Sequence, residues 1–468
     1  MQAPFDIAAD MDTPVSAYRK LSVFSPVFLL ESVEHGHTLG RYSFIGLGIA
    51  KRVCMTDGNL EIDGQAAPAP TSAADLSAIL REQLKACPHM KAGEAAAGTV
   101  AAVPFQGGLV GLIGYDFVRT VEKLPLAAFR EKGVPEINLV SPKSVLVFDH
   151  LSRRAALLHG GPEWERASLR REIIAALRAG VAPPAARSGH EPRQASLSRD
   201  EFYSRFATIR EHIVKGDVFQ LVLSIRFSGR CITEPFEVYR ALRLLNPSPY
   251  MYLLELPGQT LVGSSPEALV KLQGGVASLR PIAGTRKRGD TDAADLALER
   301  ELLADTKESA EHVMLVDLAR NDLGRVAEPG SIKVGPFRSI ERYSHVMHIV
   351  SGVQGRLAPG KDGFDLLAAT FPAGTVVGAP KVKAMEIIEN NEPIGRGFYA
   401  GTVGYLSVSG DVDMAIAIRT IEFRDGRYAY QAGAGIVEAS TAEAEYEEIL
   451  SKVGALAKAM DLAAEGVG

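Results

Sequence analysis

The chain has 468 residues, more than one ordinary hydrophobic core organises, so its length predicts two domains, or one large α+β body with an accessory domain. Hydrophobic residues make up 46% and charged residues 23% of the chain, a composition typical of folded proteins. The net charge of −5 argues against a general binder of nucleic acids or anionic membranes, because such binding needs a clustered basic surface.

Targeting and redox signals favour a cytoplasmic enzyme. The acidic N-terminus, MQAPFDIAADMD, lacks the basic and apolar segments of a secretory signal, and no uncharged apolar run of the sequence is long enough to span a bilayer. Cys54, Cys87 and Cys231 lie far apart and form no CxxC pair, which argues against a disulfide framework or a structural zinc site.

A segment rich in Pro, Ala and Ser, GVAPPAARSGHEPRQAS at 180–196, shows no apolar periodicity. It predicts an N-terminal part over 1–182, a linker over 183–197 and a C-terminal part over 198–468. The P-loop, HExxH and GxSxG motifs are absent from the sequence.

The C-terminal part opens with a predicted helix and strand. Ser198 and Glu201 form an S-x-x-E capping box, and Gly216 marks the end of the helix. Four apolar residues repeat at helical spacing between them: Phe202, Phe206, Ile209 and Ile213. The next segment, VFQLVLSIRF at 218–227, is typical of a strand with one polar stripe, which suggests a sheet that lines a polar cavity.

Hairpins and long helices alternate over the rest of the chain. The pattern predicts hairpins over 251–264 and 268–282, a helix over roughly 292–320, strands near 335–356 and 398–436, and a last helix with a capping box at Ser440 and Glu443. Sequential hairpins interrupted by helices favour an α+β fold with antiparallel sheets over a parallel βαβ fold.

Two of the predicted helices carry paired carboxylates. Glu308 and Glu311 are three residues apart, so they point the same way from their helix. Glu445, Glu448 and Lys452 form one stripe of the last helix, beside an apolar face. If the two helices face each other, the four carboxylates suit a hard divalent cation such as Mg²⁺. The alternative is two solvated acidic helix faces.

Other residues occur where a small anionic substrate would need them. Arg419 lies in an apolar segment typical of a buried strand, so it needs a partner, either a substrate carboxylate or an internal one. Gly433 and Gly435 let an anion approach the backbone, and the Gly284-Thr285 turn offers N–H groups to a substrate anion. A tight turn is the alternative explanation for these glycines.

Two further positions could carry protons. His345 and His348 alternate along a predicted strand, and one of them could titrate near neutral pH in a cavity, with a structural histidine as the alternative. Glu267 follows Ser265-Pro266 at the end of a strand. Desolvation there would keep its carboxyl protonated as a general acid, unless it is an exposed loop residue.

Long motifs of the chain follow the order of one enzyme family. They are GSSPEALV, RPIAGTRKRG, LLADTKESAEHVMLVDLARNDLGRV, YSHVMHIVSGVQG, FPAGTVVGAPKVKAMEII, FYAGTVGYL and YQAGAGIVEASTAEAEYEEILSK. They cover almost all of 200–455 and resemble the chorismate-utilising enzymes, which include anthranilate, aminodeoxychorismate, isochorismate and salicylate synthases. The resemblance implies a large α/β/β/α sandwich of antiparallel sheets flanked by helices, chorismate as substrate and Mg²⁺ as the required ion.

The resemblance also implies roles for individual residues. Glu267 resembles the acid that protonates the leaving hydroxyl, His348 resembles the active-site histidine, and Thr375 lies near the reacting ring. The residues that resemble the Mg²⁺ ligands are Glu311 and Glu448, assisted by Glu308 and Glu445. The residues that resemble the site for the substrate carboxylates are Tyr399, Arg419, Gly433, Gly435 and Lys452.

Two positions separate the branches of this family. Members that add water carry a lysine base where this chain has Gln220, and members that form a covalent intermediate carry a lysine where it has Ala283. An amide cannot deprotonate water and a methyl group cannot attack carbon, so ammonia remains as the nucleophile. This pattern resembles component I of the anthranilate synthase branch. The alternatives are an aminodeoxychorismate synthase subunit without its lysine, and a catalytically silent subunit that binds tryptophan.

The resemblance implies two further ligands. LLESVEHGHTLGRYSFIG at 29–46 and NPSPYMY at 246–252 resemble a tryptophan feedback site, for which a structural hairpin is the alternative. Its residues would be Leu30, Glu31, Ser32, Pro249, Tyr250 and Met251.

No cysteine of the chain lies in a glycine-rich elbow, so a separate glutamine amidotransferase subunit is expected to supply the ammonia in a hetero-oligomer. The expected reaction converts chorismate and ammonia to anthranilate and pyruvate, the first committed step of tryptophan biosynthesis.

Overall fold

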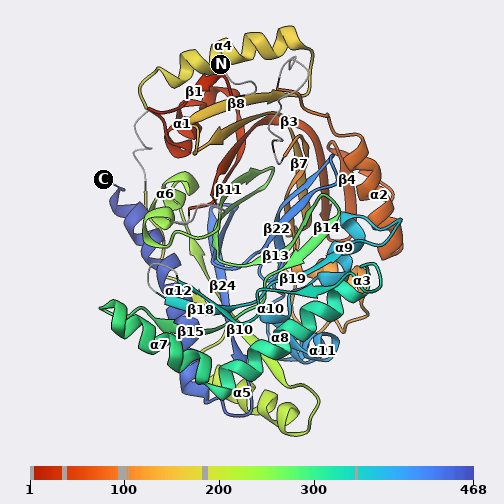
Figure 1. The fold of residues 1–468 in the computed structure, drawn as a ribbon, viewed down its shortest axis with the longest axis vertical. Coiled ribbons are helices and arrows are strands. Elements are labelled where there is room, and N and C mark those ends of the chain that lie inside the picture. Colours follow the sequence, from red (N-terminus) through yellow and green to blue (C-terminus); the bar gives the residue numbers. More distant parts are fainter. Residues whose placement is uncertain are drawn as a thin grey trace.

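A continuous antiparallel sheet passes through both parts of the chain (Figure 1). The computed structural model describes residues 5–33, 40–92, 103, 105–181, 188–342 and 346–467. Its strands are β1 (Ile7–Ala8), β2 (Pro26–Glu31), β3 (Tyr42–Thr56), β4 (Asn59–Ile62), β5 (Gln65–Ala67), β6 (Gly108–Ile113), β7 (Pro135–Asp149), β8 (Arg154–His159), β9 (Gln194–Ala195), β10 (Gln220–Arg230), β11 (Tyr250–Leu256), β12 (Gln259–Ser265), β13 (Ala268–Gln273), β14 (Val276–Leu279), β15 (Ile282–Lys287), β16 (Lys333–Val334), β17 (Ser339–Arg342), β18 (Val346–Val350), β19 (Val353–Arg356), β20 (Gly378–Ala379), β21 (Thr402–Ser407), β22 (Val412–Ile416), β23 (Thr420–Arg424) and β24 (Arg427–Ile436).

Neighbouring strands in this sheet come from distant parts of the sequence. Successive neighbours are β10, β24, β23, β12, β11, β2, β3, β7, β6, β21, β22, β13, β14 and β19. β2 therefore pairs with β11, and β6 pairs with β21, across the predicted linker. Strands from both sides of the linker share one sheet, and the division of the chain into two domains stays a prediction.

Helices surround the sheet. They are α1 (Pro14–Lys20), α2 (Ala73–Lys85), α3 (Val118–Val121), α4 (Glu163–Leu177), α5 (Arg199–Val214), α6 (Pro235–Leu245), α7 (Asp292–Ala304), α8 (Thr306–Gly324), α9 (Gly363–Thr370), α10 (Gly374–Val377), α11 (Lys381–Asn391) and α12 (Ala442–Glu465). α4 lies at the top of Figure 1, whereas α5, α7, α8 and α12 gather in its lower half. Helices around antiparallel sheets confirm the predicted α+β class.

Most predicted elements of the C-terminal part are confirmed. Ser198 and Glu201 form the reciprocal capping box of α5, and the predicted apolar face of that helix is buried. The pairs β11–β12 and β13–β14 are the two predicted hairpins. β10 begins at Gln220 rather than at Val218, and the exposed Phe219 precedes it.

The prediction of one helix over 292–320 is wrong, because the helix is interrupted at Asp305, between α7 and α8. Asp305 has extended backbone angles, and its carboxylate accepts the backbone N–H groups of Lys307 and Glu308. This N-cap starts a new helix and places Glu308 in its first turn.

The predicted capping box of the last helix is also wrong. The N-cap of α12 is Thr441, whose hydroxyl accepts the N–H of Ala444. Ser440 instead accepts the N–H of Val437, one turn before the helix. The sequence pattern placed the start of the helix one residue too early, because serine and threonine are equally suitable caps.

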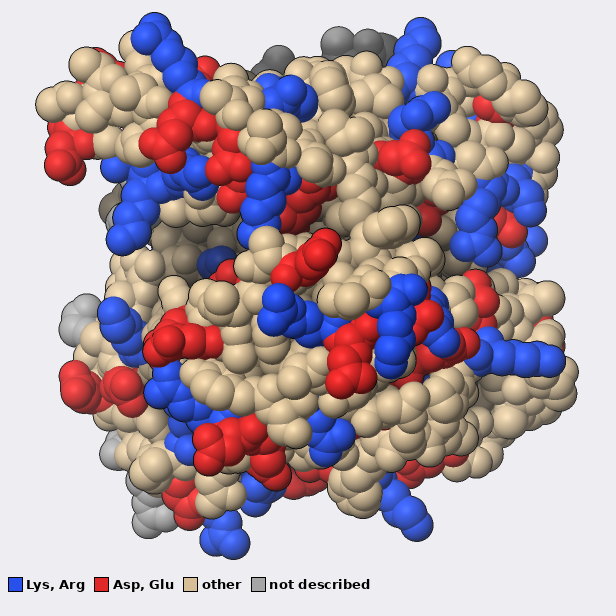
Figure 2. All heavy atoms as spheres, turned by 90° about the horizontal axis from the view of Figure 1, so that it is seen from below, with Lys and Arg blue, Asp and Glu red and all other residues tan. Residues whose placement is uncertain are grey.

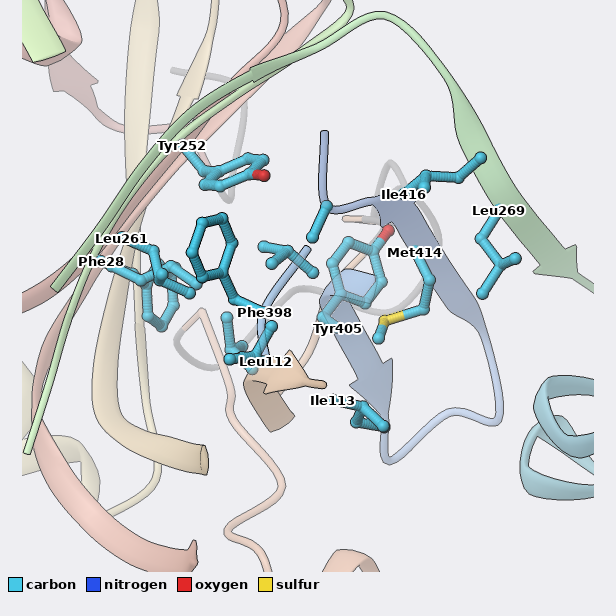
Figure 3. Close-up of a cluster of buried hydrophobic side chains, with 14 of the residues drawn as sticks. Phe28, Leu112, Ile113, Tyr252, Leu261, Leu269, Phe398, Tyr405, Met414 and Ile416 are labelled. Carbon is cyan, nitrogen blue, oxygen red and sulfur yellow. The ribbon is translucent and has the colours of Figure 1, made fainter. Parts of the chain in front are cut away.

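The main hydrophobic core joins both parts of the chain. Phe28 of β2, Leu261 of β12 and Phe398 point toward one another in the cluster of Figure 3. Phe28 and Leu261 are completely buried. A Cβ on Gly46 would overlap the ring of Phe28, so this strand pair has no room for a larger residue.

A second, smaller sheet consists of β15, β18 and β17 and packs on its own apolar cluster. Its fully buried residues are Leu302, Met347 and Ile349. Because β15 lies beside α8 and pairs with β18, this sheet brings residues 282–287 and 346–350 to the side of the acidic helix.

Cys54, Cys87 and Cys231 are free thiols buried in the structure, as expected of a chain without a disulfide framework. Within the ranges that the structure describes, no helix is both long enough and apolar enough to cross a membrane. Figure 2 shows acidic and basic side chains mixed over the lower face of the molecule, around a hollow.

We expect Phe28→Ala to destabilise both parts of the chain together, by about 3–5 kcal/mol, because it leaves a cavity where β2 meets β11. Urea unfolding followed by circular dichroism should show one transition with a lower midpoint. Leu126→Ala, at a side chain that is 75% exposed, is the control and should leave the midpoint unchanged. Two separate transitions, only one of them shifted, would contradict the shared core.

Candidate active site

α8 and α12 each carry a pair of carboxylates near the N-terminal end of the helix. Glu308 and Glu311 occupy the first two turns of α8, and Glu445 and Glu448 occupy the first two turns of α12. Burial, the charge of Glu308 and, more weakly, that of Glu448 raise the pKa of Glu311. Burial and the charge of Glu448 raise the pKa of Glu445. The two pairs are therefore within electrostatic range of each other.

Polar neighbours hold two of these carboxylates. Gln220 Nε2 donates to Glu311 Oε1 at 3.1 Å, and Lys452 Nζ lies 2.7 Å from Glu448 Oε1. In the described part of the chain, no three His, Cys, Asp or Glu side chains are close enough together to hold a metal ion. The structure brings the four glutamates into one region without gathering them into a compact set of ligands.

Glu267 follows β12 and is half-buried. Thr375 Oγ1, on α10, donates to Glu267 Oε1 at 2.9 Å. Burial raises the pKa of Glu267 to about 7, although the Thr375 hydroxyl and the charge of Lys452 oppose this shift. A carboxyl with such a pKa is partly protonated at neutral pH, as a general acid must be.

Backbone and basic groups that suit an anion lie around β24. Lys452 Nζ donates to the carbonyl oxygen of Gly433 at 2.9 Å. A Cβ on Gly433 would lie 3.0 Å from Tyr399 Oη, and a Cβ on Gly435 would lie 2.6 Å from Gln220 Nε2. A side chain at Gly433 would therefore crowd Tyr399, and one at Gly435 would crowd Gln220.

Arg419 differs from its predicted setting inside a strand. It lies in the bend between β22 and β23, with a φ of +51°. Burial lowers the pKa of its guanidinium, and no carboxylate among the described residues pairs with it. The internal salt bridge is thus not observed there, and an anionic ligand suits this cation better.

The small sheet contributes His348 and the Gly284-Thr285 turn. His348 Nδ1 lies 2.9 Å from the Gly284 carbonyl oxygen and 3.1 Å from Thr285 Oγ1. Gly284 has a φ of +66° at a bulge in β15, which turns its carbonyl toward the histidine. Burial lowers the pKa of His348, and the charge of Arg419 adds to this effect. His345 lies outside the described residues.

Arg286 reaches from the small sheet to the acidic helix. Its guanidinium lies 2.9 Å from Asp305 and 3.5 Å from Glu308. The sequence analysis did not connect this arginine to the carboxylates, since its partners depend on how the sheet packs against α8.

The two residues that separate the family branches, Gln220 and Ala283, offer different chemical groups. Gln220 is buried, and its Oε1 has no hydrogen-bond partner within the part of the chain that the structure describes. Ala283, in β15, is 9% exposed and pairs with Ile349 of β18. Gln220 therefore offers one unused acceptor, whereas Ala283 offers only a methyl group.

The predicted effector residues lie on paired strands. Met251 of β11 is the register partner of Glu31 of β2. The Glu31 carboxylate is buried and accepts hydrogen bonds from the Tyr239 hydroxyl and from Arg243.

The remaining effector residues show one unused polar group. Ser32 Oγ is buried without a hydrogen-bond partner among the described residues. Tyr250 turns its hydroxyl to Asp413 at 3.0 Å. Leu30 pairs with Tyr252, and Pro249 immediately precedes β11.

Sequence analysis missed a buried ion pair next to the site. Glu392 and Arg396 lie in NEPIGRGFY, a segment whose proline and glycines are typical of a loop. Two opposite charges at i and i+4 were the available signal. No signal in the sequence indicated the burial of this pair, because burial depends on the strands around it.

Comparisons with known proteins agree with this geometry. Residues 25–458 match the family model described as chorismate binding enzyme. The chain is 43% identical over 463 residues to anthranilate synthase component 1 of Thermus thermophilus, covering 98% of this chain and 97% of the relative. It is 43% identical over 480 residues to anthranilate synthase component 1 of Pseudomonas aeruginosa, covering 99% and 96%.

Solved structures are also similar to this chain. Anthranilate synthase component I from Streptococcus pneumoniae superposes with a TM-score of 0.78 at 33% identity, covering 91% of this chain and 94% of the other. The menaquinone-specific isochorismate synthase from Escherichia coli shares the fold, with a TM-score of 0.69 at 20% identity, covering 95% and 91%. The chain belongs to the family of chorismate-binding enzymes.

Proposed function

We propose that this chain is the synthase component of an anthranilate synthase, which converts chorismate and ammonia to anthranilate, pyruvate and water. The observation that carries the proposal is the pair Gln220 and Ala283, which supplies neither a base for water nor an amine nucleophile beside the acid Glu267. The similarity to anthranilate synthase component 1 from two bacteria, at 43% identity, supports the same assignment.

In the proposed reaction, ammonia attacks C2 of the ring while Glu267 donates a proton to the departing C4 hydroxyl. The Thr375 hydroxyl fixes the carboxyl of Glu267. Gln220 Oε1, which has no protein partner among the described residues, can accept a hydrogen bond from the incoming ammonia. Loss of the C2 proton, with His348 nearby as a carrier, and loss of the enolpyruvyl group as pyruvate then give the aromatic ring.

The substrate is a dianion, and the basic groups of the site suit it. We assign its carboxylates to Arg419, Lys452 and the backbone at Gly433 and Gly435, with Tyr399 beside them. Arg419 supports this assignment because it is a half-buried cation without a carboxylate partner in the described ranges.

The four glutamates suit Mg²⁺ by their chemistry, because this ion prefers carboxylate oxygens as protein ligands. The charges of Glu308 and Glu448 raise the pKa of Glu311, and a cation between them would relieve this repulsion. We assign direct contacts to Glu311 and Glu448, and supporting contacts to Glu308 and Glu445. Bound there, Mg²⁺ would neutralise and fix a carboxylate of the substrate.

Ammonia must come from a second protein. Burial raises the pKa of the Cys87 and Cys231 thiols, and Cys54 is buried within β3. A glutaminase needs an accessible cysteine with a lowered pKa, so a separate glutamine amidotransferase subunit is proposed as the partner.

We also propose that tryptophan inhibits the enzyme at β2 and β11. Ser32 Oγ, buried without a partner among the described residues, supports a polar ligand there. Leu30, Met251 and Pro249 would contact the indole, and Glu31 and Tyr250 lie beside them. The register of Glu31 with Met251 places both strands at one site.

The proposed function predicts that the purified chain forms anthranilate from chorismate, Mg²⁺ and ammonium, but not when glutamine replaces ammonium. Anthranilate fluorescence measures the product, and added tryptophan should slow its formation. Isochorismate or aminodeoxychorismate as the product would contradict the proposal, as would turnover of glutamine by this chain alone.

Removing one proposed Mg²⁺ ligand should abolish the reaction. Glu311→Gln or Glu448→Gln is expected to lower kcat/KM for chorismate more than about 100-fold, because the ion would lose a charged ligand. Glu443→Gln on α12, the helix of Glu448, is the control, since the Glu443 side chain is 77% exposed. Near-normal activity of either ligand variant at saturating Mg²⁺ would refute the assignment.

The rate should fall as the pH rises, because Glu267 then loses the proton that it donates. Its pKa is raised to about 7, so the donor form predominates below that pH and is lost above it. At a fixed concentration of unprotonated ammonia, we expect kcat to fall about tenfold per pH unit well above pH 7. Glu267→Gln should be about 10²–10⁴-fold slower and independent of pH in this range. A flat profile for the unmodified chain between pH 6 and 9 would contradict the acid role.

A further inference from the structure

The ion pair of Arg396 and Glu392 lies inside the protein, next to the active site. The two side chains are 1% and 3% exposed, and Arg396 Nη2 lies 2.7 Å from Glu392 Oε1. A second hydrogen bond joins Arg396 Nε to Glu392 Oε2 at 2.9 Å. The pairing is therefore bidentate, which fixes the plane of the guanidinium.

Two further donors of Arg396 bind the backbone of two active-site segments. Arg396 Nη1 donates to the Val376 carbonyl oxygen at 2.7 Å, directly after Thr375. Arg396 Nη2 donates to the Val222 carbonyl oxygen at 2.9 Å, two residues after Gln220. One guanidinium thus connects the segment of Thr375 with the strand of Gln220.

Glu392 anchors the pair to the same strand. Its Oε1 accepts the backbone N–H of Ser224 at 2.9 Å and the Ser224 hydroxyl at 2.6 Å. The Ser224 hydroxyl in turn accepts a hydrogen bond from Gln431 Nε2 on β24. The polar stripe of β10, typical of a strand beside a cavity, is used here to hold a buried charge.

Two aromatic rings lie against the guanidinium. Its Cζ is 5.0 Å from the ring centre of Tyr115 and 5.4 Å from that of Tyr399. Both rings are buried, so these cation–π contacts are shielded from water. Tyr399 is the residue whose hydroxyl lies beside Gly433.

The position of Thr375 depends on these contacts. α10 is a single turn of four residues, and after it β20 pairs with the first two residues of β10. Arg396 holds the same turn from the Val376 carbonyl. The turn also packs against α8, α11 and β24, and the contact from Arg396 adds a side-chain hydrogen bond directly after Thr375, which donates to Glu267 at 2.9 Å.

A buried ion pair is not by itself evidence of a contribution to folding stability. A buried ion pair has a large desolvation cost, and replacing both partners with apolar residues of similar size is often neutral for stability. Hydrogen bonds to two backbone carbonyls and to Ser224, by contrast, fix geometry that apolar residues would leave free.

We propose that Arg396, paired with Glu392, is a positioning residue that holds Thr375 against Glu267 and the Tyr399 ring beside the substrate site. The inference rests on the proposed function for its kinetic consequences. It adds two residues that touch neither the substrate nor the proposed metal site.

The double variant Arg396→Met with Glu392→Met tests this role. Removing both charges leaves the net charge of the interior unchanged, and Lys452, the charged neighbour of Glu267, is not altered. We expect the urea midpoint to fall, because two backbone carbonyls and the backbone N–H of Ser224 lose buried partners. Under conditions in which the variant is fully folded, kcat with ammonium should fall about 10–100-fold. KM for Mg²⁺ should change less than twofold.

The pH profile separates positioning from general damage. The Thr375 hydroxyl lowers the pKa of Glu267, so its displacement should move the decline of kcat to higher pH. Thr375→Val should give the same upward shift, and the variant with all three substitutions should shift no further. Additive shifts would overturn the proposal, as would an unchanged profile in the double Met variant.

A control is the more exposed ion pair of Arg166 and Glu163 on α4, whose atoms lie 2.6 Å apart at the other end of the molecule (Figure 1). Replacing both with Met should leave kcat and the pH profile unchanged. A similar loss in this control would show that the assay reports general destabilisation and would refute the specific role.

A crystal structure of the double Met variant tests the inference without turnover. We expect the distance between Thr375 Oγ1 and Glu267 Oε1 to exceed 3.5 Å, the limit of a hydrogen bond. If the distance stays at 2.9 Å, the positioning role is wrong whatever the reaction is. If the distance increases but the unmodified chain forms no anthranilate, the proposed function fails and the positioning role stands.

Discussion

The pairing of β10 with β24 is the interaction on which the site depends. It runs in register from Leu221 with Ile436 to Arg230 with Arg427. β20 pairs with the start of β10, where Gln220 is the register partner of Ala379. Because the register fixes every side chain to one face, this pairing brings Gln220 beside Gly435 and places α12 behind the strands. The site residues, dispersed over the sequence, meet because these strands cannot slip.

Negative charge in this region is balanced by single neighbours rather than by a surplus of cations. Glu448 has Lys452 and Glu308 has Arg286, whereas Glu311 accepts the amide of Gln220 and forms no ion pair among the described residues. Burial and the charge of Glu308 raise the pKa of Glu311, and the charge of Lys307 opposes this shift. A chain with a net charge of −5 can thus present a local site for an anion next to a local site for a cation.

Regular periodicity made parts of this structure predictable from the sequence. Helical spacing identified α5 and the paired glutamates, since i and i+3 positions share a face wherever a helix packs. The break at Asp305 and the cap at Thr441 were missed, because capping residues compete locally and packing decides between them. The family motifs supplied the roles of Glu267 and His348, which spacing alone left open. The burial of Arg396 could not be predicted, because its partners are backbone carbonyls of Val222 and Val376.

The sheet of β15, β18 and β17 rests on a core of three fully buried side chains, apart from the large core of the protein. Local opening exposes only the apolar area of the unit that opens, so separating this sheet involves a small fraction of the free energy of global unfolding. Local opening of this sheet is therefore expected to displace His348 and Thr285 while the pairing of β10 with β24 stays intact.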